Sequence, residues 1–242
     1  TEQATKISTV NGNLSVTGTS ASTTGNDNAG VFLRWGARVA ATGFGNLTIN
    51  GTGANIAGTG EIGVYIADVN VEVSSGAMEI TGTASNISGN NSHGVFVWEH
   101  GAVNVLVTDT GSLKMTGTGY GTGYGIFTAA ASSITHNIGG ANASAVTFVA
   151  DSMAISNPSS GTVSIQTAST GTVSLRQKTA GTNINLGGVD ILSGTPLQLG
   201  ITNQELGSIS STGTIAVGDA GTGLVNVTSN ISVGTKNLTL TG

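Results

Sequence analysis

The side chains that can do chemistry are sparse in this chain and are spread along it. A glycoside-cleaving site needs a pair of Asp or Glu side chains, and a Ca²⁺ site needs several oxygen ligands. No close carboxylate pair recurs at one strand position among the twelve acids, which are Glu2, Asp27, Glu61, Asp68, Glu72, Glu79, Glu99, Asp109, Asp151, Asp190, Glu205 and Asp219. Because an active site needs convergent titratable groups, the sequence predicts that this protein is not an enzyme.

Metal and cofactor sites are not expected either. The chain has no cysteine, and its three histidines (His93, His100 and His136) lack a metal-ligand spacing such as His-x-x-x-His. His93 and His100 flank one predicted strand, which leaves a weak metal site there as an open alternative to solvated turn histidines. The Gly-x-Gly strings at 119–123 lack the Lys-Ser/Thr pair of a phosphate-binding loop.

Two short tracts have side chains suited to binding a partner. Arg34-Trp35 and Trp98-Glu99-His100 each follow a Gly-Val-Phe strand, in the first and third copies of the repeat described below. Trp offers a flat apolar face with a polar edge, which suits stacking on a sugar or on a protein. The alternative, which we favour, is that both Trp side chains cover a corner of the fold and shield its core. Arg34, Trp35, Trp98, Glu99 and His100 are nevertheless the candidate ligand-binding residues.

A fourfold repeat from Leu14 to about Thr128 must position these tracts. The first motif of each copy recurs after 33, 31 and 35 residues, as LSVTG (14–18), LTING (47–51), MEITG (78–82) and LKMTG (113–117). The second recurs after 33, 31 and 31 residues, as GVFL (30–33), GVYI (63–66), GVFV (94–97) and GIFT (125–128). Self-similarity at this period indicates stacked repeats, and the alternation of apolar residues indicates β-strands. With a third strand in at least three copies, each unit corresponds to one rung of a parallel β-helix or slightly more.

One aromatic residue occupies the same place in every copy: Phe32, Tyr65, Phe96 and Phe127. Aromatic residues in register on successive coils stack as a ladder. We expect this ladder to lie in the core and to have no binding role.

The pattern divides the chain into three stretches. Residues 1–137 hold the four repeats of 31–35 residues, and 138–160 form an irregular transition. Residues 161–242 have a shorter strand spacing, with most strand cores 6 to 11 residues apart, and continue the first stretch. Within them, Thr202 and Glu205 form a capping box that predicts one helical turn outside the coil, with an ordinary polar loop as an equal alternative.

Composition supports an all-β, folded chain and excludes several classes. Only 8% of residues are charged while Gly occupies 39 positions, and the mean hydropathy is +0.20, above the range of disordered chains. The net charge of −5 with only seven Lys and Arg disfavours nucleic-acid binding. No apolar run approaches the roughly 20 residues that a membrane-spanning helix needs, so no membrane insertion is expected. A chain without cysteine, with low charge and much Thr and Gly, fits a secreted bacterial surface protein better than a cytosolic enzyme.

A resemblance to a known family adds to this interpretation. The segment PLQLGITNQEL (196–206), with SIS (208–210) and GTIAVG (213–218), resembles the repeat of bacterial exoproteins of the filamentous haemagglutinin type and of autotransporter passengers. There an LG(I/L)(T/S)xxEL turn leads into G(T/S)(L/I)xIG. The resemblance covers roughly residues 181–242 and is one of style over 12–137. It implies a secreted parallel β-helix that serves as an adhesin or surface fibre, and we expect the chain to be a segment of a longer one.

We therefore expect an all-β, right-handed parallel β-helix (a β-solenoid) of about ten coils, on the order of 50 Å long at about 4.8 Å per coil. The expected function is a structural and adhesive segment of a bacterial fibre protein, extracellular or on the cell surface. Its expected partners are itself, end to end, or neighbouring repeats of a longer chain, together with a glycan or a protein of a host or neighbouring cell. Two alternatives stay open: a self-assembling extracellular matrix or sheath subunit, and a carbohydrate-active β-helix enzyme, which a carboxylate cluster on one face would favour.

Overall fold

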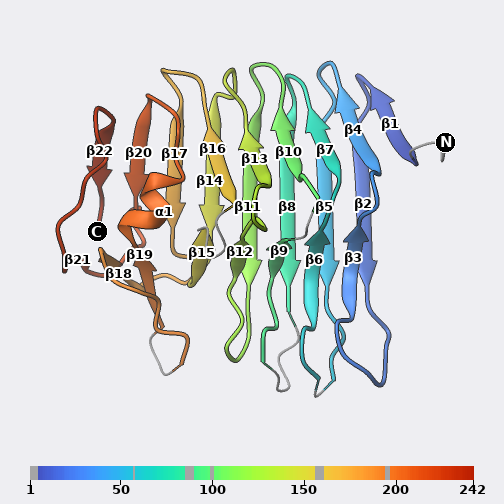
Figure 1. Ribbon diagram of the computed structural model, residues 1–242, viewed down its shortest axis with the longest axis horizontal. Helices are drawn as coiled ribbons and strands as arrows, with labels where there is room; N and C mark the ends of the chain where they lie inside the picture. Colours follow the sequence, from blue (N-terminus) through green and yellow to red (C-terminus); the bar gives the residue numbers. More distant parts are fainter. Residues whose placement is uncertain (1–4, 57, 85–89, 99–100, 156–160, 194–196) are drawn as a thin grey trace.

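The protein is a parallel β-helix, as the repeat predicts. The computed structural model describes residues 5–56, 58–84, 90–98, 101–155, 161–193 and 197–242. Over these residues the chain forms 22 strands and one short helix. All the paired strands run parallel, in three long sheets and one short one, and the coils follow one another from the N-terminal to the C-terminal end (Figure 1).

The three long sheets run along the stack. In spatial order, sheet A holds β1 (Lys6–Val10), β4 (Arg38–Thr42), β7 (Asn70–Val73), β10 (Asn104–Val107), β13 (Thr135–Gly139) and β16 (Thr162–Gln166). Sheet B holds β2 (Leu14–Thr19), β5 (Leu47–Thr52), β8 (Ala77–Thr83), β11 (Ser112–Thr118), β14 (Ala145–Val149), β17 (Thr172–Arg176), β20 (Thr214–Val217) and β22 (Asn237–Leu240). Sheet C holds β3 (Ala29–Leu33), β6 (Ile62–Ile66), β9 (Val95–Val97), β12 (Ile126–Thr128) and β15 (Met153–Ile155).

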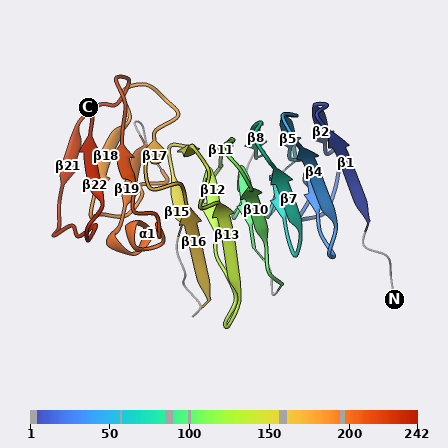
Figure 2. The same ribbon diagram turned by 90° about the horizontal axis from the view of Figure 1, so that it is seen from above.

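Each copy of the repeat is one coil that passes through sheets B, C and A in turn. Leu14 pairs with Leu47, Leu47 with Met78 and Met78 with Leu113, so the sequence repeat equals the strand register. Seen from above, the coils are displaced from one another along the same axis (Figure 2). The coil continues through β13, β14 and β15, which pair with the strands of the coil before them.

The last part of the chain is less regular than the repeat. A short fourth sheet holds β19 (Gln198–Ile201), β18 (Asn183–Leu186) and β21 (Val225–Val227). One coil lengthens here, because Val173 of β17 pairs with Ile215 of β20. The helix α1 (Asn203–Gly207) belongs to the chain segment between Val173 and Ile215 that forms this long coil. Both hydrogen bonds of the predicted capping box are present, which confirms the helical turn.

The expected number of coils is wrong. Sheet B, the longest sheet, has eight strands, which at about 4.8 Å per strand span roughly 34 Å rather than 50 Å. After residue 161 successive strand cores form the sides of one coil, and the coil from Val173 to Ile215 takes 42 residues, which reduces the number of coils. Apolar residues also alternate at Ile231 and Val233, but this segment lies outside any strand.

Inward-facing side chains form continuous columns. In sheet B one column comprises Ile49, Ile80, Met115, Phe148, Leu175 and Val217, all at most 2% exposed. Identical stacking in each sheet buries the apolar side chains between neighbouring coils, as expected of a solenoid whose stability comes from nearest-neighbour contacts.

Glycine is required at the corner between sheets B and C. A Cβ placed on Gly82, which lies in β8, would come within 2.0 Å of the carbonyl oxygen of Gly94, the residue before β9. One coil later, a Cβ on Gly117 would come within 1.8 Å of the carbonyl oxygen of Gly125. The two glycines of each repeat unit therefore let the chain cross itself closely at this corner.

Candidate functional site

A column of aromatic side chains runs along the outer face of sheet C. Phe32, Tyr65, Phe96 and Phe127 are direct partners in β3, β6, β9 and β12. Their ring centroids are 4.5, 4.9 and 5.2 Å apart in that order. The ladder predicted from the repeat is confirmed.

The predicted burial of this aromatic column in the core is wrong. Phe32 is 41% exposed and the other three rings are half-buried, whereas Val31, Val64, Val95 and Ile126 beside them are buried. In a strand, adjacent residues point to opposite faces. The smaller aliphatic residue of each pair faces the core, and the ring therefore lies outside.

More rings join the column at its C-terminal end, around Phe96 and Phe127. The imidazole of His93 is parallel to Phe96 at 4.7 Å and parallel to Tyr124 at 6.0 Å. Trp98 meets Phe127 edge-on at 6.4 Å. Since the residues before and after β9 supply His93 and Trp98, a single coil contributes three of these rings.

These rings line a pocket of about 380 Å³ on the outer side of sheet C. We call it the sheet C pocket. Its aromatic wall consists of His93, Phe96, Trp98, Tyr124 and Phe127, and its polar lining includes Asp27 and Asn91.

His93 is neutral and its tautomer is set by the backbone. Its Nδ1 accepts the backbone N–H of Tyr124 at 3.0 Å, so the ring proton lies on Nε2. Burial lowers the pKa of His93 to about 4, and the hydrogen bond to Tyr124 opposes that shift only in part. No described residue accepts a hydrogen bond from Nε2, which leaves this donor for a ligand.

The polar side of the sheet C pocket contains three residues with a left-handed backbone conformation, one on each of three successive coils. Asp27, Gly60 and Asn91 have φ of 58°, 76° and 57°, and backbone hydrogen bonds join their loops coil to coil. A Cβ on Gly60 would lie 2.1 Å from Oδ1 of Asp27, so glycine leaves room for that carboxylate. Asp, Asn and Gly are the residues that adopt this conformation most readily.

A buried carboxylate, Glu61, directly follows Gly60 in the sequence. Glu61 is fully buried, and its Oε1 accepts a hydrogen bond from Nδ2 of Asn28 at 3.2 Å. Its Oε2 has no partner among the described residues. Burial raises the pKa of Glu61, and the charge of Asp27 raises it further, while the bond from Asn28 opposes this.

The sequence-predicted residues fall into two groups. Arg34 and Trp35 lie at the N-terminal end of the column, where the guanidinium of Arg34 lies 4.6 Å from the ring centre of Phe32 and 3.0 Å from that of Trp35. Trp98 lies two coils away at the sheet C pocket. Glu99 and His100 lie outside the described residues, and so does the metal site considered for His93 with His100.

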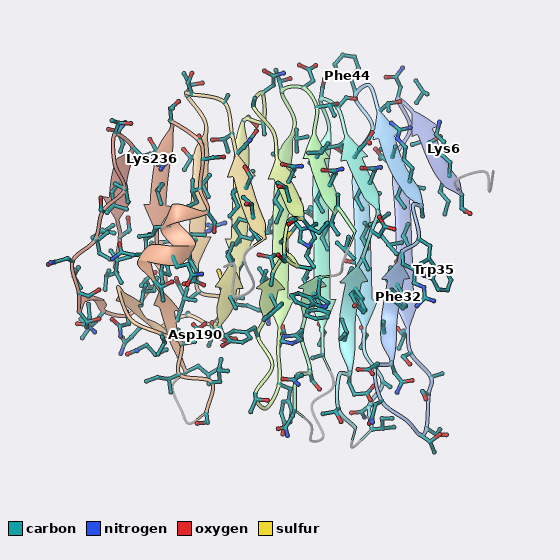
Figure 3. All side chains as sticks on the ribbon, in the orientation of Figure 1. Lys6, Phe32, Trp35, Phe44, Asp190 and Lys236 are labelled. Carbon is teal, nitrogen blue, oxygen red and sulfur yellow. The ribbon has the colours of Figure 1, made fainter. Side chains whose placement is uncertain are left out.

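Trp35 does not shield the core. It is 76% exposed and has φ of 61°, a left-handed conformation that is unusual for a bulky residue. Figure 3 shows it projecting near Phe32 at the N-terminal end of the stack. An exposed aromatic held in a strained turn is the kind of outlier that motivates a functional hypothesis.

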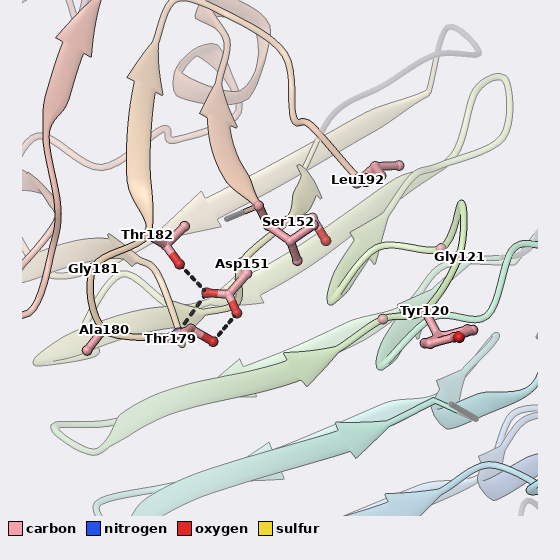
Figure 4. A pocket seen from close by; sticks show the side chains of 12 residues that line it. Tyr120, Gly121, Asp151, Ser152, Thr179, Ala180, Gly181, Thr182 and Leu192 are labelled. Atoms are coloured by element: carbon pink, nitrogen blue, oxygen red, sulfur yellow. Dashed lines mark hydrogen bonds between the residues drawn. The ribbon is translucent and has the colours of Figure 1, made fainter. Parts of the chain in front are cut away.

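A second pocket, of about 480 Å³, lies between the loop at Gly119–Gly123 and the turn at 179–182. The carboxylate of Asp151 accepts hydrogen bonds from the backbone N–H groups of Lys178 and Thr179 and from the Thr179 hydroxyl, at 2.6–2.8 Å. Figure 4 shows this carboxylate turned toward Thr179 and Thr182. Asp151 thus holds the turn, and it is the one charged side chain among the described residues that line this pocket.

Two carboxylates, the half-buried Asp190 and the buried Glu205, meet the free edge of sheet C. Asp190 accepts the backbone N–H of Met153 at 3.0 Å and that of Gly200 at 2.7 Å. Glu205 accepts the backbone N–H of Ile155 at 3.1 Å and that of Thr202 at 2.8 Å. The two acids therefore bond the N–H groups of β15 that a further strand would otherwise bond.

The surroundings of this pair raise the pKa of both acids. Burial raises the pKa of Asp190 to about 8, and the charge of Glu205 adds a smaller contribution in the same direction. The hydrogen bonds from Gly200 and Met153 oppose the shift. Burial also raises the pKa of Glu205. Because all four oxygens are bonded to the backbone, the pair is a structural cap of sheet C.

Sequence reasoning missed the pocket and this cap. The three left-handed residues of the pocket had a visible signal in the sequence, since Asp27, Gly60 and Asn91 follow the repeat spacing of 33 and 31 residues. Asp190 and Glu205 had none, because their contacts with β15 span 37 and 50 residues.

The described residues hold no group of three or more His, Asp or Glu side chains placed to bind a metal ion. The same residues include no helix with the length and apolar character of a membrane span. Comparison with protein-family models, curated proteins and solved structures finds no significant match.

Proposed function

We propose that this chain is a structural and adhesive segment of a secreted or cell-surface fibre protein, and that its partner binds the outer face of sheet C. The observation that carries the proposal is the aromatic column, which places four in-register rings outside the core. Aromatic and Arg side chains are enriched in binding surfaces, and Arg34 and Trp35 extend the column at one end.

The fold supports a presenting role. Coils stacked through continuous sheets form a stiff scaffold, and side chains on its outer face keep a fixed spacing. Such a face suits repeated weak contacts with an extended partner, whose effects add when many copies or repeats engage together.

Two other roles considered from the sequence receive less support. A carbohydrate-active enzyme would use a carboxylate pair, but the oxygens of Asp190 and Glu205 are all bonded to backbone N–H groups. A self-assembling matrix subunit, like end-to-end stacking of this chain, stays a prediction that sedimentation at increasing protein concentration tests.

The adhesive function is tested with coated beads. Beads carrying the wild-type chain are compared with beads carrying a variant in which Phe32, Tyr65, Phe96 and Phe127 are replaced by Thr, which keeps a high strand propensity. The targets are immobilised polysaccharides, extracellular-matrix proteins and whole cells. The matched control is Phe44→Thr, because Phe44 is 79% exposed and lies away from sheet C (Figure 3).

We expect the wild type and the control to adhere to at least one target and the fourfold variant to lose adhesion. Circular dichroism and thermal melting must show that the fourfold variant is folded. Equal adhesion by a folded fourfold variant, or no adhesion of the wild type to any target, overturns the proposal. Antibody labelling of intact source cells tests the surface location separately, and labelling only after permeabilisation contradicts it.

A further inference from the structure

We propose that the sheet C pocket binds one sugar ring of a neutral glycan, whose C–H face packs on the aromatic wall and whose hydroxyls bond to Asp27, Asn91 and His93. This inference rests on the proposed adhesive function and names the chemistry of its ligand.

The aromatic wall fits a ligand with an apolar face. Five rings from two successive coils line the pocket, packed against one another at 4.7–6.4 Å. Such mutual packing fixes their orientation before a ligand arrives, which lowers the entropy cost of binding. The volume of about 380 Å³ lies in the range of about 300–1,000 Å³ typical of small-ligand sites.

The polar lining fits a ligand that both donates and accepts hydrogen bonds. Asp27 accepts, the Asn91 amide does both, and His93 donates through Nε2 because its Nδ1 is already used. The left-handed backbone at Asp27 and Asn91 holds two of these groups at the rim. A sugar ring combines an apolar C–H face with hydroxyls that donate and accept, so it matches both sides of the pocket.

The charge of the lining selects against other small ligands. None of the described lining residues is Lys or Arg, and Asp27 is an acid, so phosphate, sulfate and acidic sugars are disfavoured. A quaternary ammonium would gain from aromatic rings and a carboxylate. It would, however, leave the Nε2 donor of the buried His93 without an acceptor, and a buried unpaired donor is costly.

The test uses a variant in which Trp98 is the sole tryptophan. The chain has two tryptophans, so Trp35→Asn leaves Trp98 to report on the pocket, and Asn suits the left-handed turn. Its fluorescence is followed during titration with the methyl glycosides of glucose, galactose, mannose and N-acetylglucosamine. Choline and inorganic phosphate are titrated in parallel, and saturation-transfer NMR identifies the sugar protons that contact the protein.

Two pocket variants and one control make the test specific. Trp98→Ala removes part of the wall and is followed by NMR. Asp27→Asn removes a charge while keeping the side-chain shape and tolerating the same backbone conformation. Phe44→Ser removes an exposed aromatic elsewhere.

We expect saturable binding of at least one glycoside, with transfer to its ring C–H protons. Affinity should fall about tenfold in each pocket variant, because Trp98→Ala removes a ring contact and Asp27→Asn replaces a charge-assisted hydrogen bond with a weaker neutral one. It should be unchanged in Phe44→Ser. The inference is overturned if no glycoside binds, if only choline or phosphate binds, or if both folded pocket variants bind glycoside as well as the control does.

The two proposals fail in different ways. Loss of bead adhesion in the fourfold Thr variant, without binding of any glycoside, overturns the sugar site and leaves the adhesive face standing. Glycoside binding together with adhesion that survives the fourfold substitution overturns the adhesive face and leaves the sugar site standing.

Discussion

The imidazole of His93 lies parallel to the ring of Phe96, with centroids 4.7 Å apart and an interplanar angle of 4°. One residue precedes β9 and the other belongs to it, so a single coil supplies both rings. The contact ties a titratable side chain into the aromatic wall, and it connects the stability of this face to pH.

Acid should destabilise the protein through His93. Its pKa is about 4 in the folded chain and about 6.5 in the unfolded chain, so between these values the unfolded state binds more protons. The contribution of His93 to the free energy of unfolding should therefore fall as pH drops from about 6.5 to 4, by up to about 3 kcal/mol. Denaturant titrations across this range measure the loss.

The control for this prediction is His93→Gln, which should reduce the loss without removing it. His136 is also buried with a lowered pKa, and its contribution has the same sign. The raised pKa values of Asp190 and Glu205 change stability in the opposite sense over this pH range. The test is therefore the difference in stability between the wild type and His93→Gln, and a difference that stays constant between pH 6.5 and 4 would contradict the account of His93.

Alkali should destabilise the protein through Asp190. Burial raises its folded pKa to about 8, against about 3.9 when unfolded. In this window the folded state binds the extra proton, so stability should fall as pH rises toward 8, with a slope of at most about 1.4 kcal/mol per pH unit. The range 6.5–8 isolates this effect from His93, and Asp190→Asn should flatten the slope there. The same slope in Asp190→Asn would show that another group is responsible.

The corner glycines should tolerate no side chain. In Gly82→Ala the added Cβ would meet the backbone of Gly94, and backbone cannot move aside cheaply. We expect a loss of about 3 kcal/mol or more, measured by chemical denaturation. Gly207→Ala is the matched control, because a Cβ there meets nothing within 4 Å. Similar stability of the two variants would refute the close crossing at this corner.

Replacing Trp35 by a residue that suits its left-handed backbone conformation should stabilise the protein. A left-handed conformation costs a bulky residue about 1–2 kcal/mol, and the exposed contact with Arg34 returns only about 0.5–1 kcal/mol. Trp35→Asn should therefore stabilise the chain by about 0.5 kcal/mol while weakening adhesion at that end of the column. Phe44→Asn should bring no such gain, and a destabilised Trp35→Asn would show that Trp35 has a structural role.

The sequence predicts the coil well because the repeat and the register are the same quantity. The strands around Leu14, Leu47, Met78 and Leu113 pair as their spacing indicates. The capping box is equally local, since Thr202 and Glu205 are three residues apart, and it forms as predicted.

Whether the aromatic column faces the core or the solvent could not be predicted from the same pattern. In Gly-Val-Phe both neighbouring residues are apolar, so an alternation of period two fits either face inward. The choice depends on the space inside the coil, which the inward apolar side chains of sheets A and B also occupy. The cap by Asp190 and Glu205 depends on contacts between distant parts of the chain, which no local pattern carries.

The measurement that tests the central claim most directly is hydroxyl-radical footprinting of the wild-type chain while it adheres to its target. We predict reduced oxidation of Phe96, Trp98, Tyr124 and Phe127 in the adhered state and unchanged oxidation of Phe44. Unchanged oxidation of the sheet C rings together with protection of Phe44 would place the contact on another face and contradict the account.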